Sequence, residues 1–417
     1  MSIPSEPAPP LPPPPQARPS TPRTPGGTAA SGGQESAPVR EKRPKRRLPR
    51  RFHRPAGWAI RGALGGLLAP GASVSIDVAG ALGRAFATSP VNRTRLHRAQ
   101  AHLRVAMPEL DERANRRVAV ESFGHLFQLA VEVAYTPRLM TEHGWHRRLH
   151  LGQIDGALRE LLRAGPCLLI SGHCGNWELL GFALALMGFP MHALYRPLDL
   201  TPLDDWVRRT RGRRGLVLVD KFGAVQDLPP LLGRRAPIGF VADQNGGDRG
   251  LFVPFFNRLA STYKSIGLLA MQYEATVICG CARRIRPDLP RPGDPVPSRG
   301  GPGRGGVHDR FAYVMEVHDA IGPDDWADQP DPLFYISARY RRAIEGMVRR
   351  APEQYFWMHR TWRSRPRHER LGRPMPGPLR EKIASLPWMT PEQLGRIERQ
   401  SRADAQTLAR IGQSRLP

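Results

Sequence analysis

Residues 170–178 read Ile-Ser-Gly-His-Cys-Gly-Asn-Trp-Glu, and this stretch decides the fold predicted for the chain. The four residues that end at Ile170 are apolar and suit a short buried strand. From Trp177 onward, apolar residues recur at helical spacing. We therefore expect a strand, a glycine-bearing turn that carries His173, and a helix that Asn176 caps.

His173 and Glu178 form an H-x4-E pattern that suits acid–base chemistry. On one helix, side chains five residues apart would diverge by roughly 140°. Across a glycine-bearing turn they can meet, and the helix N-terminus would keep Glu178 ionised beside a histidine general base. The pattern also arises by chance, and a lone histidine at a strand end is more often structural. The order of the surrounding segments must decide between these interpretations.

From Ile154 onward, helical and strand patterns alternate, which is typical of an α/β domain with a mostly parallel sheet. In such a sheet, sites form where the strands end, and His173, Arg196 and Asp243 each follow a predicted strand. The predicted strands are 167–171, 191–195, 216–219, 237–241, 276–282 and 311–317. The predicted helices are 154–163, 177–188, 202–212, 224–232, 262–273 and 333–350, after two helices within 97–134.

Several short blocks occur in an order that resembles the bacterial lipid A biosynthesis acyltransferases, the late lauroyl and myristoyl transferases of the lysophospholipid acyltransferase group. The resemblance runs from about Gly57 to Pro366. Each block alone is a weak sign of the resemblance, but the whole set in the same order is a strong one. The blocks are Leu96-His-Arg-Ala-Gln-Ala-His-Leu-Arg-Val-Ala-Met-Pro108, Glu121-Ser-Phe-Gly-His-Leu126, His173 to Glu178, Tyr195-Arg-Pro-Leu198, Ala242-Asp-Gln244, Phe252-Val-Pro-Phe-Phe256 and Ala351-Pro-Glu-Gln-Tyr-Phe-Trp-Met-His-Arg-Thr-Trp362.

The resemblance implies a glycerolipid-acyltransferase-like fold, with a mostly parallel sheet flanked by helices and N-terminal membrane-associating helices. It also implies transfer of a fatty acyl chain from acyl carrier protein, or acyl-CoA, to a hydroxyl of a lipid A precursor or related glycolipid. His173 would be the base and Glu178 would fix its tautomer, because a hydroxyl is a poor nucleophile at neutral pH. No metal, cofactor or covalent enzyme intermediate is expected. A phospholipid or aminolipid acceptor stays open.

The same resemblance suggests a substrate-binding set. Arg196 would contact a substrate phosphate, unless it pairs with Asp199. Asp243 would hold Arg196 or Arg249, or cap a turn. Three aromatic residues around Pro254 would line an acyl-chain groove, or belong to the core. The full expected set is Asn176, Arg196, Asp243, Gln244, Arg249, Phe252, Phe255 and Phe256.

The chain divides by composition into four parts. Residues 1–55 hold 15 prolines and a basic run, so we expect a disordered tail. Residues 56–95 read as an amphipathic, membrane-associating segment or as a docking helix. The α/β domain would cover 96–366, with a Pro/Gly-rich loop at 286–307, and 367–417 would be a linker and helical extension.

The net charge of +25 points to anionic partners such as a membrane surface, a phosphorylated glycolipid or an acidic carrier protein. A nucleic-acid-binding protein is the alternative from another class. Since the chain lacks the motifs of such proteins, we expect no nucleic acid partner. No window has the roughly 18 uninterrupted apolar residues of a spanning helix. We therefore expect a peripheral or monotopic protein at the cytoplasmic face of the inner membrane.

Four cysteines occur, at positions 167, 174, 279 and 281. Neither pair has the spacing of a zinc or redox motif. The sequence therefore predicts four reduced thiols in a cytoplasmic protein.

Overall fold

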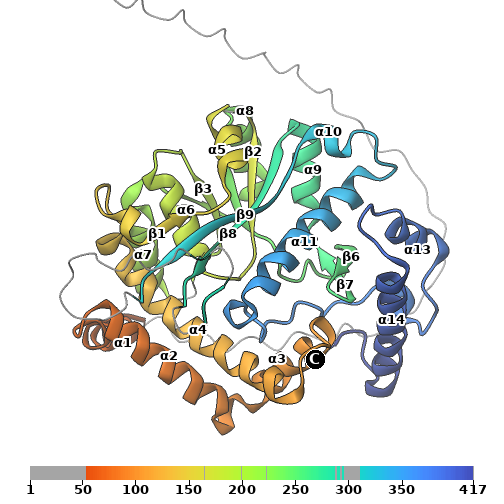
Figure 1. Ribbon diagram of the computed structural model, residues 1–417, viewed down its shortest axis with the longest axis horizontal. Helices are drawn as coiled ribbons and strands as arrows, with labels where there is room; N and C mark the ends of the chain where they lie inside the picture. The colour runs from red at the N-terminus through yellow and green to blue at the C-terminus, as the bar shows by residue number, and fades with distance from the viewer. Residues whose placement is uncertain are drawn as a thin grey trace, which may run out of the picture. The chain divides into compact units, whose positions relative to one another are not determined.

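The alternating pattern builds a seven-stranded sheet with the order β1-β9-β8-β2-β5-β3-β4 (Figure 1). Neighbouring strands are parallel except for β8 and β9, which are antiparallel. A separate antiparallel hairpin pairs β6 with β7. The strands are β1 Leu149–Leu151, β2 Cys167–Ser171, β3 His192–Tyr195, β4 Val217–Asp220, β5 Ile238–Val241, β6 Leu251–Phe255, β7 Arg258–Thr262, β8 Thr276–Arg284 and β9 Tyr313–Ile321.

This computed structural model describes residues 53–163, 165–198, 200–221, 223–286, 289–291, 294 and 310–416. The expected tail, apart from residues 53–55, and most of the expected loop at 286–307 lie outside these ranges. The helices are α1 His53–Leu68, α2 Ala72–Thr88, α3 Arg93–Ala106, α4 Glu112–Leu139, α5 Asp155–Leu162, α6 Trp177–Leu186, α7 Thr201–Arg211, α8 Ala224–Gly233, α9 Lys264–Tyr273, α10 Pro323–Trp326, α11 Pro332–Arg350, α12 Arg367–Arg370, α13 Gly377–Ala384 and α14 Pro391–Ile411, with short 3-10 turns between some of them.

The central strand β2 is buried on both faces, because its side chains alternate between two apolar cores. Leu168 and Ile170 pack with residues of α8, α9 and α11. Cys167 and Leu169 pack with residues of α5 and α6. The expected mixed α/β fold with a mostly parallel, helix-flanked sheet is confirmed.

The six strands predicted from the sequence all form, but β1 and the β6–β7 hairpin were not predicted. The hairpin turns at Phe256 and Asn257, with Phe255 paired to Arg258. Phe256 has φ of 56°, a conformation that glycine usually supplies in such turns. A turn without glycine gives no hairpin signal in the sequence, which explains the omission.

Helix α2 packs along α4 through small residues. A Cβ added at Gly83 would lie 2.5 Å from the backbone oxygen of Phe123, so only glycine allows this close crossing. The opposite side of α2 leaves Val74, Val78 and Leu82 exposed, at spacings of four residues. Among the described helices, none has the length and apolar character to cross a membrane alone. Residues 57–68 and α2 meet those criteria only as a pair, bent by 118°.

The C-terminal helices join the core through α14. Asp404 accepts hydrogen bonds from Arg258 of β7 and lies 2.8 Å from Arg365, and both arginines are buried. Arg365 also pairs with Glu369 at 2.6 Å. Such buried charges are tolerated because they are mutually paired. The C-terminal extension, to which we could assign no role from the sequence, therefore packs against the β6–β7 hairpin.

Buried neutral histidines should make the fold sensitive to acid. Burial lowers the pKa of His102 from 6.5 to about 3, and that of His368 to about 4. The unfolded chain binds these protons near pH 6.5, so the free energy of unfolding should fall as the pH drops below 6.5. Replacing His102 with Gln should reduce the fall in the free energy of unfolding between pH 7 and pH 5 by about 2 kcal/mol. Denaturant-induced unfolding measured at both pH values tests this prediction. The exposed His97→Gln on the same helix is the control, and equal losses in the His102 variant and the wild type would refute the prediction.

Candidate functional site

The turn after β2 places His173 at the carboxyl edge of the sheet, and backbone hydrogen bonds fix its course. The backbone N–H of Phe356 donates to the oxygen of His173 at 3.1 Å, and that of Asn176 donates to the oxygen of Ala282 at 2.7 Å. Gly175 has φ of 59°, and a Cβ there would lie 2.3 Å from the same Ala282 oxygen. Only glycine fits this position.

Asn176 caps α6 as predicted, because its side-chain oxygen accepts from the backbone N–H of Leu179 at 2.9 Å. Its amide donates to Glu132 and to the hydroxyl of Tyr313. The side chain is fully buried by these contacts. Asn176 therefore holds the turn and the helix together, and its expected contact with a substrate stays a prediction.

The carboxylate that contacts His173 is Asp243. The Nδ1 of His173 lies 2.6 Å from Oδ1 of Asp243. The register explains the contact, because Ser171 of β2 pairs with Val241 of the neighbouring β5. His173 and Asp243 each come two residues after this pair, just past the ends of β2 and β5. Parallel neighbours end at the same edge, so the two side chains meet there.

Asp243 is held as a buried anion. Burial opposes its ionisation, but the charge and hydrogen bond of His173 and the charge of Arg341 outweigh that cost and hold the pKa of Asp243 well below its usual range. Arg341 of α11 is fully buried and donates to the backbone oxygens of Asp243 and Gln244 at 2.7 and 3.0 Å. The arginine therefore fixes the segment that carries the carboxylate.

These contacts decide which nitrogen of His173 is basic. An ionised carboxylate only accepts hydrogen bonds, so Nδ1 carries the proton. The other nitrogen, Nε2, then carries the lone pair and accepts a hydrogen bond from the amide N–H of Gln244 at 3.2 Å. His173 is partly exposed, with 17% of its side chain accessible. The geometry is compatible with a general base that accepts a proton at Nε2.

Glu178 does not take the orienting position expected for it. In the first turn of α6 it forms an ion pair with Arg211 at the end of α7 and accepts from the indole N–H of Trp177 at 3.1 Å. The Trp177 ring lies edge-on to the His173 ring, with centroids 4.9 Å apart. Glu178 does not reach His173 because its side chain points toward α7. The register between β2 and β5 brings Asp243 to Nδ1 of His173 instead. Glu178 touches the site through Trp177.

The predicted arginine contacts of Asp243 are not formed. Arg196 follows β3 and Arg249 follows the turn after β5, and both are exposed. Within the described residues, neither has an ion pair. Asp243 uses its carboxylate for His173 instead. Phosphate contact by Arg196 stays a prediction.

The phenylalanines around Pro254 belong mainly to the core. Phe255 and Phe256 are buried and pack against Trp362 and Trp357, whereas Phe252 is half-buried. Of the two expected interpretations, the structure shows core packing for Phe255 and Phe256, and an acyl-chain groove at these residues stays a prediction. Their packing on the tryptophans of the 351–362 block accounts for their burial.

An apolar cavity of about 100 Å³ lies between the sheet and helices α5 and α6. Trp177 and Ser171 line it near the His173 turn, and Ile154, Leu158 and Leu184 line it farther along. Trp177 therefore contacts both the histidine ring and the cavity. The sequence shows these residues only as helix faces, so the cavity could not be predicted from their spacing.

A cluster of arginines at the start of α3 and after Trp357 was also missed by the sequence analysis. Arg98 donates to the backbone oxygen of Met358 at 3.4 Å. Burial and the nearby charges of Arg360, Arg95 and Arg363 lower the pKa of Arg98. No acidic side chain in the described structure pairs with these four. Phe356 links the cluster to the site, because its ring lies 6.0 Å from that of His173 and 5.9 Å from that of His359.

Comparison with known proteins places these features in a family. Residues 40–286, more than half of the chain, match the family described as bacterial lipid A biosynthesis acyltransferase. The chain is 27% identical over 283 residues to a lipid A biosynthesis acyltransferase of Haemophilus influenzae, covering 66% of this chain and 77% of that protein. It is 24% identical to a lipid A biosynthesis lauroyltransferase of Escherichia coli and 22% identical to a palmitoleoyltransferase of that species, each covering 64% of this chain and 78% of the relative. The chain is an acyltransferase and belongs to the bacterial lipid A biosynthesis acyltransferase family.

Proposed function

We propose that the protein transfers a fatty acyl chain from the thioester of an acyl carrier protein to a hydroxyl of a lipid A precursor or related glycolipid. The observation that carries this proposal is the His173–Asp243 pair, which makes Nε2 of the histidine the nitrogen that can accept a proton. The acceptor hydroxyl loses its proton to Nε2 while its oxygen bonds to the thioester carbon. The C–S bond then breaks, and the proton passes to the departing thiolate.

Gln244 occupies the position that the acceptor hydroxyl takes in this reaction. Its amide nitrogen lies 3.2 Å from Nε2 of His173, a distance suited to a hydrogen bond. The hydroxyl replaces this contact when the acceptor binds. Asp243 keeps the ring in its tautomer and stabilises the imidazolium that forms.

The apolar cavity supports an acyl substrate. Its lining begins at Trp177, which contacts the His173 ring, so a chain held there would leave its thioester carbon at the turn. Burying each methylene of an acyl chain stabilises the complex by about 0.8 kcal/mol. A carbon chain is therefore the ligand that this lining favours.

The arginine cluster supports an anionic acceptor. Arg95, Arg360 and Arg363 are exposed, and guanidinium groups bind phosphate through paired hydrogen bonds. A lipid A precursor carries phosphate groups, whereas an uncharged acceptor would gain nothing from four unpaired cations. The cluster comes from α3 and the 357–363 segment. It does not include Arg196, which follows β3.

The N-terminal helices support attachment to the cytoplasmic face of the inner membrane. Val74, Val78 and Leu82 form an exposed apolar stripe on α2, and Trp58 of α1 is 70% exposed. Such a stripe binds the interfacial region of a bilayer through its apolar side chains. The acceptor lipid would then reach the site without leaving the membrane.

The roles of the two carboxylates can be separated by mutation. Replacing His173 with Ala should reduce kcat about 100-fold or more, because it removes the base. Asp243→Ala should approach the same loss, whereas Glu178→Ala should lose less than about tenfold, since Glu178 acts through Trp177 and Arg211. The measurement is steady-state transfer from an acyl carrier thioester to a lipid A precursor.

The exposed Asp205→Ala on α7 serves as the matched control and should keep full activity. Circular dichroism of each variant shows whether it is folded. A folded Asp243 variant with wild-type kcat, beside a Glu178 variant without activity, would contradict the assigned roles. Full activity in the His173 variant would refute the mechanism itself.

The arginine cluster predicts how the acceptor is recognised. Changing Arg360 and Arg363 together to Gln should raise the KM for a phosphorylated acceptor about tenfold or more, because charge-assisted hydrogen bonds to phosphate are lost. The KM for the same acceptor after dephosphorylation should stay unchanged. Arg117→Gln, an exposed change on α4, is the control. An equal rise in KM for both acceptors would show that the cluster does not recognise the phosphate group.

A further inference from the structure

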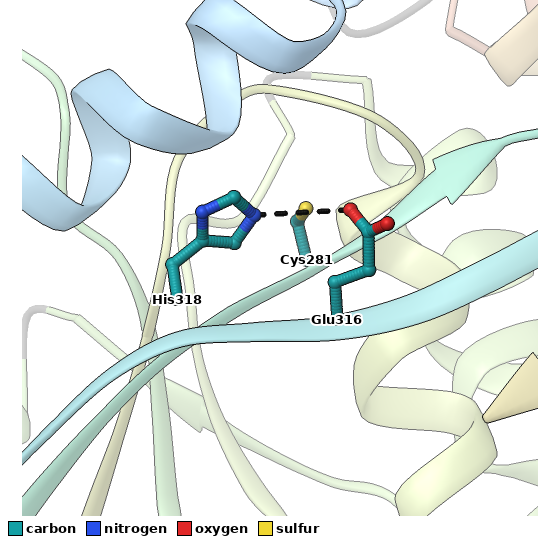
Figure 2. A group of neighbouring side chains, drawn as sticks. All are labelled: Cys281, Glu316 and His318. Atoms are coloured by element: carbon teal, nitrogen blue, oxygen red, sulfur yellow. Dashed lines mark ion pairs between the residues drawn. The ribbon is translucent and has the colours of Figure 1, made fainter. Parts of the chain in front are cut away.

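Three side chains that can bind a metal converge where β8 and β9 pair, apart from the His173–Asp243 pair (Figure 2). One of them, Glu316, also lines the apolar cavity. Cys281 of β8 stands directly opposite Glu316 of β9. The register shifts at the next residues, because Gly280 pairs with Val317 and Cys279 pairs with Asp319. His318 is thus the extra residue of a β-bulge, a feature that redirects side chains. Figure 2 shows its ring turned toward the thiol and the carboxylate.

The spacing of the three donor atoms suits a small tetrahedral ion. The thiol sulfur, one imidazole nitrogen and one carboxylate oxygen all lie within 4.8 Å of one another. Nε2 of His318 is 3.8 Å from Oε2 of Glu316. Zinc binds sulfur at about 2.3 Å and nitrogen or oxygen at about 2.0–2.2 Å, which puts its ligands roughly 3.5 Å apart. Small side-chain shifts would complete the coordination.

An unsatisfied atom marks the centre of this group. Nε2 of His318 is buried and has no hydrogen-bond partner, although it faces Cys281 and Glu316. Buried polar atoms in native proteins normally have a partner, and a bound ion is one recognised reason for an apparent exception. The side chains of Glu316 and His318 are 12% and 17% exposed, so the group is open to a small ion from solvent.

The surroundings orient the carboxylate donor. Arg283 donates to Glu316 at 2.8 Å, and Arg350 donates to the same oxygen at 3.2 Å. Supporting hydrogen bonds of this kind orient carboxylate ligands in metal sites.

The positive charges beside Glu316 are partly offset. Arg283 also pairs with Asp294 at 2.7 Å, so its charge is shared between two carboxylates. The set offers sulfur, nitrogen and oxygen donors together, a combination that suits zinc better than magnesium or calcium.

We propose that Cys281, Glu316 and His318 form a binding site for a zinc-class divalent cation. The ion would fasten the bulge of β9 to β8, whose Ala282 oxygen accepts from the backbone of Asn176 beneath the His173 turn. It would thus stiffen the support of the turn that carries His173, and through Glu316 it would border the apolar cavity. The expectation of no metal rested on cysteine spacing, which cannot reveal ligands that come from two neighbouring strands.

Cobalt titration tests the site directly. The full-length protein is treated with chelator, purified, and titrated with Co²⁺ while the thiolate-to-cobalt charge-transfer absorption is recorded. We expect one equivalent to bind with that absorption and to be displaced by Zn²⁺. The absorption should vanish in Cys281→Ser, and affinity should fall about tenfold or more in His318→Gln.

Cys279→Ser is the matched control, because Cys279 lies two residues away on the same strand and is equally buried. It should bind cobalt like the wild type. Circular dichroism confirms folding, and if Cys281→Ser does not fold, Glu316→Gln and His318→Gln carry the test. Absence of the absorption in the folded wild type, or its persistence in Cys281→Ser, would overturn the site. The readout does not depend on acyl transfer, so it stands apart from the proposed function.

Discussion

The register between β2 and β5 is the constraint on which the site depends. Ser171 lies opposite Val241, and the backbone N–H of Ala242 donates to the oxygen of Ser171 at 2.8 Å. This pairing puts His173 and Asp243 level at the edge of the sheet. A shift by one residue would turn the strand's apolar side chains to the opposite face and separate the pair. The hydrogen bond between imidazole and carboxylate is thus a product of the core packing of both strands.

Segments from the second half of the chain then hold this pair in place. Arg341 of α11 fixes the backbone around Asp243, and the 354–356 segment bonds the turn that carries His173. Trp177 packs on the imidazole ring, and Glu178 fixes Trp177 by accepting its indole N–H. In the proposed reaction the H-x4-E pattern therefore holds the base and a residue that positions its neighbour, while the orienting carboxylate follows a different strand.

The sequence predicted the elements of the fold better than the contacts between them. Strand β2 was predicted with its bounds, because an apolar run before a glycine-bearing turn is a local signal. The cap at Asn176 is equally local. The partner of His173 was not predictable from spacing, since β2 and β5 are neighbours in the sheet but have β3 and β4 between them in the chain. The hairpin at Phe256 lacked the glycine that marks such turns, and the Cys281 group depends on a bulge.

The most direct test of this account is the tautomer of His173 in the free enzyme. Nitrogen-15 NMR of histidine-labelled protein at neutral pH reports which ring nitrogen carries the proton, and the His173→Gln spectrum assigns the signal. The account predicts a neutral ring protonated at Nδ1, with Nε2 unprotonated. It also predicts that Asp243→Ala abolishes this preference and Glu178→Ala keeps it. A neutral ring protonated at Nε2, or a tautomer that depends on Glu178 and not on Asp243, would contradict it.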